Sequence, residues 1–158
     1  MRHLAYTVYL LRHKTRVFAH SLILGVPVRG LFHDCSKFSR VEWRGIGRQF
    51  YPSNQAEKDE NGPLFSAAKA HHRQRNLHEI DHWHGENDEC APIPVLVLKE
   101  TMADWAAFGG LCLSRGSIRH QARQCYEKWG RNYRMDQDAR AWIEDFLGIV
   151  SGEGPGDD

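Results

Sequence analysis

Apolar and ring-bearing side chains recur every three or four residues from Leu4 to Leu24, which is the spacing of one face of an α-helix. Gly25 and Pro27 then end the pattern. No stretch of the chain alternates polar and apolar residues for long enough to indicate a strand of a sheet. A helix with one apolar face must bury that face against other elements. The sequence therefore predicts an all-α protein folded as a compact helical bundle.

Further helices are predicted by the same periodicity and by start and stop signals. One begins near Arg40, and others span residues 64–76, 95–108, 117–129 and 136–149. Ser39 and Glu42 have the spacing of a capping box, in which the Ser side chain accepts from one free amide and the Glu side chain returns to the other. The polar residues 51–63 contain Pro, Asn and Gly, which predicts an exposed loop at the lid or rim of a site.

The length of 158 residues suits one domain, because such a chain buries roughly 68–70% of the surface that its unfolded form exposes. We expect residues 1–150 to form a single helical domain. Residues 151–158 are mostly Gly, Pro and acidic, which predicts a disordered tail.

Charge and hydropathy exclude several classes of partner. Lys and Arg together number 21 against 20 for Asp and Glu, so no global field selects nucleic acid or an anionic membrane. The start of the chain matches a signal peptide poorly, and no segment approaches the ~18 consecutive apolar residues of a membrane span. The cysteines form no C-x-x-C pair, which favours reduced thiols. We expect a cytoplasmic protein with a small-molecule partner, and the sequence leaves a homo-oligomer open.

Ten histidines, several of them close to carboxylates, are the combination that borderline divalent metals require. His13, His33, Asp34 and Asp104 come from separate segments and offer a donor set for one catalytic ion. A carboxylate such as that of Asp34 can also bridge two ions. Lys37 follows Asp34 by three residues and can hold a phosphate oxygen on the same side of a helical turn.

A second concentration of basic side chains lies between residues 71 and 84 and contains too much imidazole for one ion. It suggests a second metal position held by His72 and His78, with His71 as a further candidate. Arg73 and Arg75 are candidates for phosphate binding. The remaining histidines of this stretch, His82 and His84, are expected at the surface or rim.

Each of these residues also has a purely structural interpretation. His13 on an apolar helical face can be a core histidine bonded to a carbonyl. Asp104 lies among apolar residues, so its burial needs compensation, either by a metal or by an arginine. The arginines at 115, 119, 123, 131 and 134 form a stripe that could bind nucleic acid but is more often solvated surface.

The order His13, His33-Asp34, His71-His72 and Asp104 resembles the H…HD…H…D order of the HD-domain phosphohydrolase superfamily. The resemblance extends from about residue 3 to residue 108, and residues 33–37 look like that superfamily's HD-x-x-K turn. The segments around His13, residues 33–39 and residues 72–78 also resemble a functionally unassigned family of small proteins common in phages and bacteria.

The superfamily resemblance implies an HD-like helical fold and metal-assisted hydrolysis of a phosphoester or phosphoanhydride in a nucleotide or nucleotide-like molecule. A nucleotidase, a nucleoside triphosphohydrolase and a phosphodiesterase all stay open, although the Gly-Tyr-Pro signature of cyclic-dinucleotide enzymes is missing after His72. The resemblance implies one or two ions of Mn, Fe, Co, Ni or Zn, with Lys37, Arg73 and Arg75 neutralising phosphoryl charge. The alternative is a non-catalytic, metal-stabilised module that sequesters a nucleotide.

Overall fold

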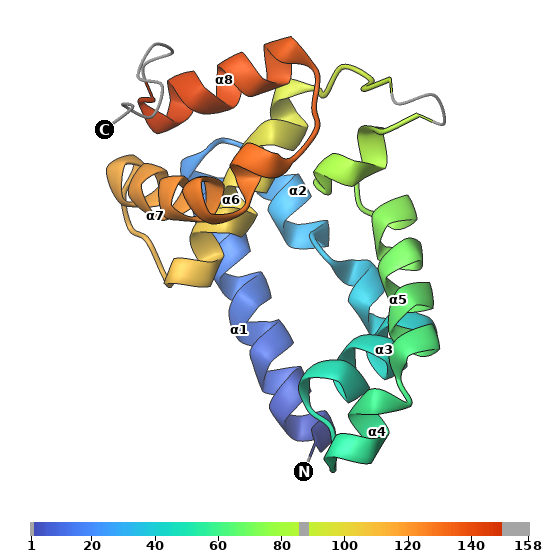
Figure 1. Ribbon diagram of the computed structural model, residues 1–158. Coiled ribbons are helices and arrows are strands. Elements are labelled where there is room, and N and C mark those ends of the chain that lie inside the picture. The colour runs from blue at the N-terminus through green and yellow to red at the C-terminus, as the bar shows by residue number, and fades with distance from the viewer. Residues whose placement is uncertain (1, 86–88, 150–158) are drawn as a thin grey trace, which may run out of the picture.

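The computed structural model describes residues 2–85 and 89–149, which fold into helices joined by turns and loops (Figure 1). The α-helices are α1 (Arg2–Ile23), α2 (Pro27–Phe32), α3 (Arg40–Phe50), α4 (Gln55–Asp59), α5 (Gly62–Arg75), α6 (Val95–Gly109), α7 (Arg115–Lys128) and α8 (Gln137–Leu147). Short 3-10 helices are η1 (Cys35–Phe38), η2 (Ile80–Trp83) and η3 (Gly130–Asn132). Extended pairing in the described part of the chain is limited to one bridge between His84 and Cys90. The prediction of an all-α bundle is confirmed.

Two segments contain helices that the sequence analysis did not predict. Residues 28–32 belong to a helix, α2, because Pro27 occupies its first turn, where a missing N–H costs nothing. The predicted loop 51–63 contains α4 and the start of α5, and its Asn61 is buried. The side chain of Asn61 donates to the Gly45 carbonyl over 2.8 Å, which ties this connection to α3. The predicted tail, residues 151–158, lies outside the described residues.

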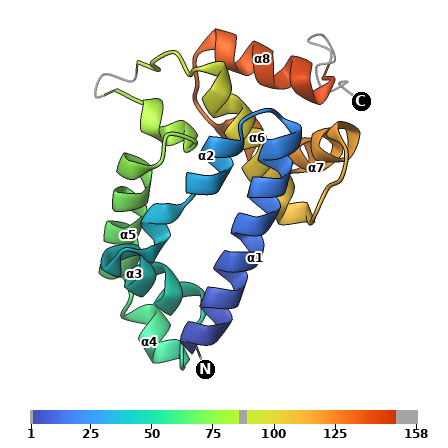
Figure 2. The same cartoon turned by 180° about the vertical axis from the view of Figure 1, so that it is seen from behind.

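The helices form two groups that meet along α1 and α2 (Figures 1 and 2). In one group, α3 lies against α5, and α4 connects their ends. In the other, α6 lies between α1 and α7, with α8 packed across one end. None of the helices within the described residues is both long enough and apolar enough to cross a membrane.

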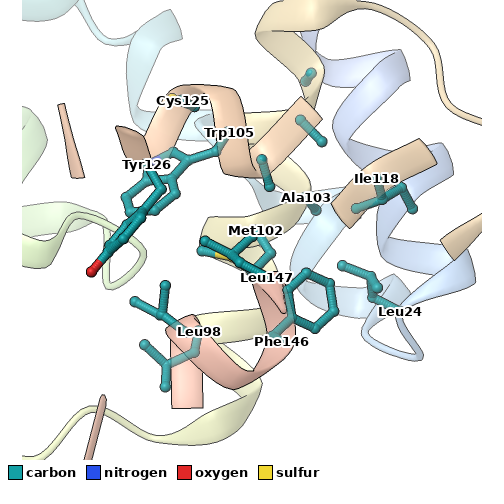
Figure 3. Close-up of a cluster of buried hydrophobic side chains, with 14 of the residues drawn as sticks. Leu24, Leu98, Met102, Ala103, Trp105, Ile118, Cys125, Tyr126, Phe146 and Leu147 are labelled. Carbon is teal, nitrogen blue, oxygen red and sulfur yellow. The ribbon is translucent and has the colours of Figure 1, made fainter. Parts of the chain in front are cut away.

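The core surrounds α6, whose residues 97, 98 and 100–107 are all buried (Figure 3). Met102 and Ala103 are fully buried and belong to the same apolar cluster as Ile118 of α7 and Leu147 of α8. Fully burying a side chain as large as Met, Ile or Leu stabilises the folded state by about 1.5–3 kcal/mol. Glu100 and Asp104 therefore lie on the most rigidly surrounded helix of the protein.

The contact between α3 and α5 depends on Gly45. A Cβ atom at this position would lie 2.4 Å from the Leu64 carbonyl oxygen and 2.6 Å from the Ala68 Cβ atom. Neither atom belongs to a flexible side-chain end, so only glycine allows the backbones to approach this closely. The approach brings Glu42 of α3 within reach of the histidines on α5.

His20 joins α1 to α6 and to the loop that follows α6. Its ring is fully buried, with Nδ1 donating to the Ala103 carbonyl over 3.1 Å and Nε2 accepting from the Cys112 N–H over 2.8 Å. This pair of bonds requires the neutral ring. Burial accordingly lowers the pKa of His20 from 6.5, although the bond to Ala103 acts in the opposite direction.

Replacing His20 with leucine leaves the Cys112 N–H without a partner, so we expect the free energy of unfolding near pH 7.5 to fall by about 1–3 kcal/mol. The unfolded chain takes up a proton as the pH falls through about 6.5, whereas folded His20 resists protonation. Wild type therefore loses this contribution on acidification, and the difference between wild type and variant narrows near pH 5.5. Urea unfolding at both pH values measures it, and a difference that widened at the lower pH would contradict this account.

Candidate metal centre

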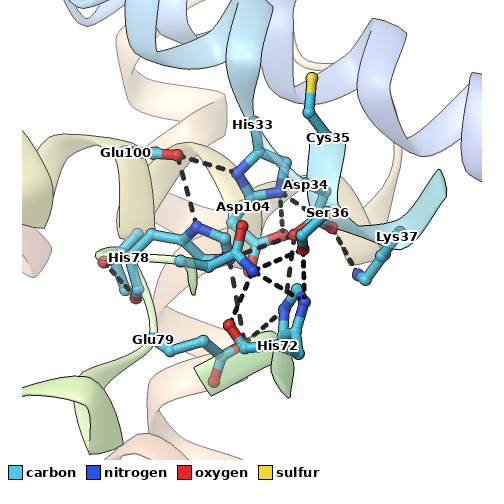
Figure 4. Close-up of polar contacts among 12 residues, drawn as sticks. His33, Asp34, Cys35, Ser36, Lys37, His72, His78, Glu79, Glu100 and Asp104 are labelled. Carbon is cyan, nitrogen blue, oxygen red and sulfur yellow. Dashed lines mark hydrogen bonds and ion pairs between the residues drawn. The ribbon is translucent and has the colours of Figure 1, made fainter. Parts of the chain in front are cut away.

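Buried histidines and carboxylates from α1, the α2–η1 turn, α5 and α6 meet in one place (Figure 4). His13 lies in the middle of α1, and Asp104 lies on α6. His33 and Asp34 form the turn between α2 and η1, and His72 lies near the end of α5. His78, in the loop after α5, completes the cluster. Segments more than 90 residues apart in sequence thus share one buried polar site.

The turn that carries His33 and Asp34 has an unusual backbone conformation. Asp34 has a φ of 56° and lies in the left-handed region, the one non-glycine residue with positive φ in the described chain. A short polar side chain tolerates this conformation better than a bulky one. Lys14 of α1 stabilises the turn, because its Nζ donates to the carbonyls of Leu31, at 3.3 Å, and His33. The turn aims both carboxylate oxygens of Asp34 into the cluster.

A first group of donors consists of His13, His33 and Asp104, with one carboxylate oxygen of Asp34 beside them. The Asp104 Oδ1 atom lies 2.9 Å from His13 Nε2 and 3.4 Å from His33 Nε2. The Asp34 Oδ2 atom approaches the same two nitrogens, at 3.9 Å from His13 Nε2 and 3.3 Å from His33 Nε2. Two imidazole nitrogens and two carboxylates therefore surround one position.

A second group shares Asp34 and faces its other oxygen. The Asp34 Oδ1 atom lies 3.4 Å from His72 Nε2 and 3.5 Å from His78 Nε2. The Glu79 Oε1 atom lies 3.2 Å from the same nitrogen of His72. The donor atoms of Asp34, His72 and His78 all lie within 4.8 Å of one another, as do those of the first group. Asp34 is the carboxylate common to both groups.

Two further carboxylates orient the imidazole rings from outside. The Glu100 Oε1 atom lies 3.1 Å from His33 Nδ1 and 3.4 Å from His78 Nδ1, and Arg29 Nε donates to Oε2 over 2.7 Å. The Glu42 Oε2 atom lies 2.8 Å from His72 Nδ1. A carboxylate that accepts a hydrogen bond from the Nδ1–H leaves the lone pair of Nε2 free and raises its basicity. The Nε2 lone pairs of these rings thus point into the cluster.

Three buried atoms of the cluster lie close to charged neighbours but make no hydrogen bond of normal geometry: His13 Nε2, His33 Nε2 and Asp34 Oδ1. Unsatisfied buried polar atoms are costly, and so many in one place require an explanation. All three are good donors to a borderline divalent ion, and a cation among them would satisfy each one. The residues present therefore fit a metal.

The charge balance keeps the carboxylates ionised, as metal ligands must be. Burial acts to raise the pKa of Asp34, but His33 and Lys37 hold it well below its usual value. Burial likewise acts to raise the pKa of Asp104, but its interactions with His13 and His33 hold this pKa well below its usual value. Burial lowers the pKa of His72, but its bonds to Glu42 and Glu79 raise it to about 9. A proton on this ring would compete with a metal.

A cavity of about 910 Å³ opens beside the cluster and reaches Lys37, His72 and Glu79. The other basic side chains that line it are Lys69 and Arg73. Much of the remaining wall is aromatic. Its rings belong to Tyr6, Tyr9, Phe50, Tyr51, Phe65, Phe108, Trp129 and Tyr133. The space is of the size that proteins use for small organic ligands.

The remaining predicted residues fall in different places. His71 is outside both donor groups, and its Nδ1 lies 2.7 Å from Glu42 Oε1. Arg73 lines the cavity, with Nη2 3.6 Å from Asp81 Oδ2. Arg75 borders a separate hollow beside Arg29 and Glu100, so the structure does not bring it to the cavity.

The structure also bears on the expected surface position of His82 and His84 and on the structural interpretations of His13 and Asp104. His82 and His84 bond to the carbonyls of Arg73 and Arg134, away from both donor groups. No carbonyl partner of His13 and no arginine partner of Asp104 is found within the described residues, where these two side chains face each other. The core-histidine and buried-arginine interpretations are therefore not supported by these contacts.

Three acidic residues of the site had no predicted role there. Glu42 was expected to return to the amide of Ser39. Ser39 Oγ does accept from the Glu42 N–H. The Ser39 N–H, however, donates to the Ser36 carbonyl, and the Glu42 side chain bonds His71 and His72. Glu100 lies four residues before Asp104, on the same helical face, and this spacing is the signal that could have revealed it. For Glu79, the one signal in the sequence is that it directly follows His78.

A family model described as a family of unknown function, DUF5662, matches residues 2–149. The chain belongs to the DUF5662 family. The match spans all the donor residues of both groups, so the cluster lies within the DUF5662 region. No curated protein and no solved structure matches the chain.

Glu100 is expected to stabilise the fold as well as the site. Replacing it with glutamine removes the charge that Arg29, His33 and His78 share, so the free energy of unfolding in EDTA should fall by about 1–3 kcal/mol. Glu127→Gln is the matched control, because that exposed residue pairs with Arg123 on the surface and its replacement should cost less than about 0.5 kcal/mol. Urea denaturation measures both, and equal small effects would show that the buried network is not stabilising.

Proposed function

We propose that this protein is a metal-dependent phosphohydrolase that cleaves a phosphoester or phosphoanhydride bond of a nucleotide or nucleotide-like small molecule. The observation that carries the proposal is the placement of Asp34. Its two carboxylate oxygens face two separate pairs of histidines, which is how a carboxylate bridges two ions.

The donor chemistry favours transition metals. His13, His33 and Asp104 would hold one ion and His72 and His78 the other, with Asp34 shared between them. Mixed nitrogen and oxygen donors suit Mn, Fe, Co, Ni or Zn better than Ca. Bound divalent ions at such a site supply a hydroxide at neutral pH by lowering the pKa of water from about 15.7 towards 7.

The protein's own side chains would bind and orient the substrate. Lys37, Lys69 and Arg73 line the cavity and offer cationic partners for phosphoryl oxygens. Lys37 forms an ion pair with Asp34, so its ammonium is held at the edge of the donor groups. Glu42 and Glu100 hold the imidazoles of His72, His33 and His78 in fixed orientations.

The order of the donors along the chain gives independent support. A histidine on the first helix, a His-Asp turn, a histidine on a later helix and an aspartate beyond it follow the pattern of the HD superfamily. The aromatic lining of the cavity suits a base, because every base has a π face that stacks on such rings. Cytoplasmic location remains an expectation from sequence.

Metal content provides the first test. We expect purified protein dialysed against Mn, Co or Zn to retain about two ions per chain, because two donor groups share Asp34. His13→Ala and His78→Ala should each retain about one ion, and Asp34→Ala should retain fewer than either. His120→Ala, on the exposed face of α7, is the matched control. Elemental analysis measures the metal content per chain, and an unchanged content in all the variants would contradict the proposed site.

Phosphate release provides the second test. With Mn, Co or Ni and a panel of nucleoside mono-, di- and triphosphates, we expect Asp34→Ala to lower kcat/KM by at least about 100-fold, because both donor groups lose a ligand. Asp59→Ala, at an exposed position of α4, is the control. Turnover that Asp34→Ala leaves unchanged would refute the site. Metal-dependent nucleotide binding without turnover would identify a sequestering module instead.

A further inference from the structure

A second, smaller hollow adjoins the main cavity beside the donor groups. Its volume is about 150 Å³, and His78 and Asp104 form part of its wall. Glu79, Phe108, Trp129 and Tyr133 border both this hollow and the main cavity. We call the smaller hollow the aromatic arm. A ligand at the donor groups can therefore extend into the arm.

The arm is built mainly from rings. Trp105 and Tyr133 lie nearly parallel, with centroids 6.2 Å apart and planes 16° apart. Phe108 and Trp129 meet edge to face, with centroids 6.3 Å apart. Rings in such arrangements offer flat faces to a planar group, and stacking on them is worth about 1–3 kcal/mol per base.

The charges along the cavity and the arm differ in sign. Lys37, Lys69 and Arg73 line the main cavity, whereas no Lys or Arg among the described residues lines the arm. The charged side chains of the arm are the carboxylates of Glu79 and Asp104. An anionic group therefore suits the main cavity, and a hydrogen-bond donor suits the arm.

Glu79 is the side chain placed to accept from such a donor. Its Oε1 atom lies beside His72 Nε2, at 3.2 Å, and more distantly beside His78 Nε2, at 3.9 Å (Figure 4). The Glu79 side chain is 34% exposed and borders the arm, so a ligand there can reach it. A carboxylate oxygen accepts from an amino group and repels a carbonyl oxygen.

We propose that the aromatic arm binds a base carrying an exocyclic amino group, so that the substrate is a nucleotide of cytosine or adenine. This inference rests on the proposed function and names its substrate class. The volume of the arm equals that of about five water molecules, which is enough for one base. The cytosine N4 amino group donates to Glu79, as carboxylates accept from this group elsewhere, while uracil presents an oxygen there.

The decisive measurement is the ratio of kcat/KM for CMP to that for UMP, with the ratio for AMP to IMP as the purine comparison. A charge-assisted hydrogen bond gives wild type a preference for CMP of at least about tenfold. Glu79→Gln offers a donor to uracil O4, so the ratio falls to about one or below. Trp129→Leu weakens stacking of both bases and lowers both kcat/KM values by a similar factor of about five or more. Glu127→Gln, exposed on α7, leaves the ratio unchanged.

A binding measurement separates this inference from the proposed function. Phosphonate analogues of CMP and UMP, with CH₂ in place of the ester oxygen, bind to the metal-loaded protein without turnover, and calorimetry gives their Kd values. Equal turnover and equal binding of the cytidine and uridine compounds would overturn the inference and leave the hydrolase intact. Tighter binding of the cytidine analogue with no hydrolysis of any nucleotide would overturn the hydrolase and support the arm. A preference for IMP over AMP would also overturn the inference.

Discussion

The left-handed turn at Asp34 is the constraint on which the polar interior depends. It presents one carboxylate to two pairs of imidazoles, with one oxygen toward each pair. Lys14 fixes the turn from α1 through carbonyls, and Lys37 compensates the buried charge. The helices around the turn are positioned so that a costly backbone conformation and a buried anion are both stabilised by neighbours.

Helix packing and site chemistry are linked through the carboxylates outside the donor groups. Glu42 reaches α5 because Gly45 permits α3 to approach it closely, and Glu100 reaches His33 and His78 from the helix at the centre of the core. Because their helices are held in place by packing, the carboxylates of Glu42 and Glu100 keep the neighbouring imidazole rings in fixed orientations. The orientation of those rings is therefore a property of the core as much as of the site.

Sequence reasoning predicted what periodicity and chain order determine. The helices of the second half and the donor set of His13, His33, Asp34 and Asp104 follow from spacing and from a superfamily pattern. It was harder to predict which of two nearby residues on one helix faces the site. Successive side chains point about 100° apart, and side chains two residues apart point about 200° apart. His72 thus faces the donors while His71 does not, and Arg73 lines the cavity while Arg75 does not. Glu42 satisfied a local rule in sequence, but three-dimensional contact gave its side chain other partners.

Helix α6 supplies Asp104 and Glu100 from the most buried part of the chain, about seventy residues after the turn that they complete. A nascent chain that has not yet added this helix already contains the paired imidazoles and Asp34, but it lacks the closing aspartate. In the proposed two-ion site, the group of His13, His33 and Asp104 would therefore be completed only when the central helix docks, so binding of that ion would be coupled to the final step of folding.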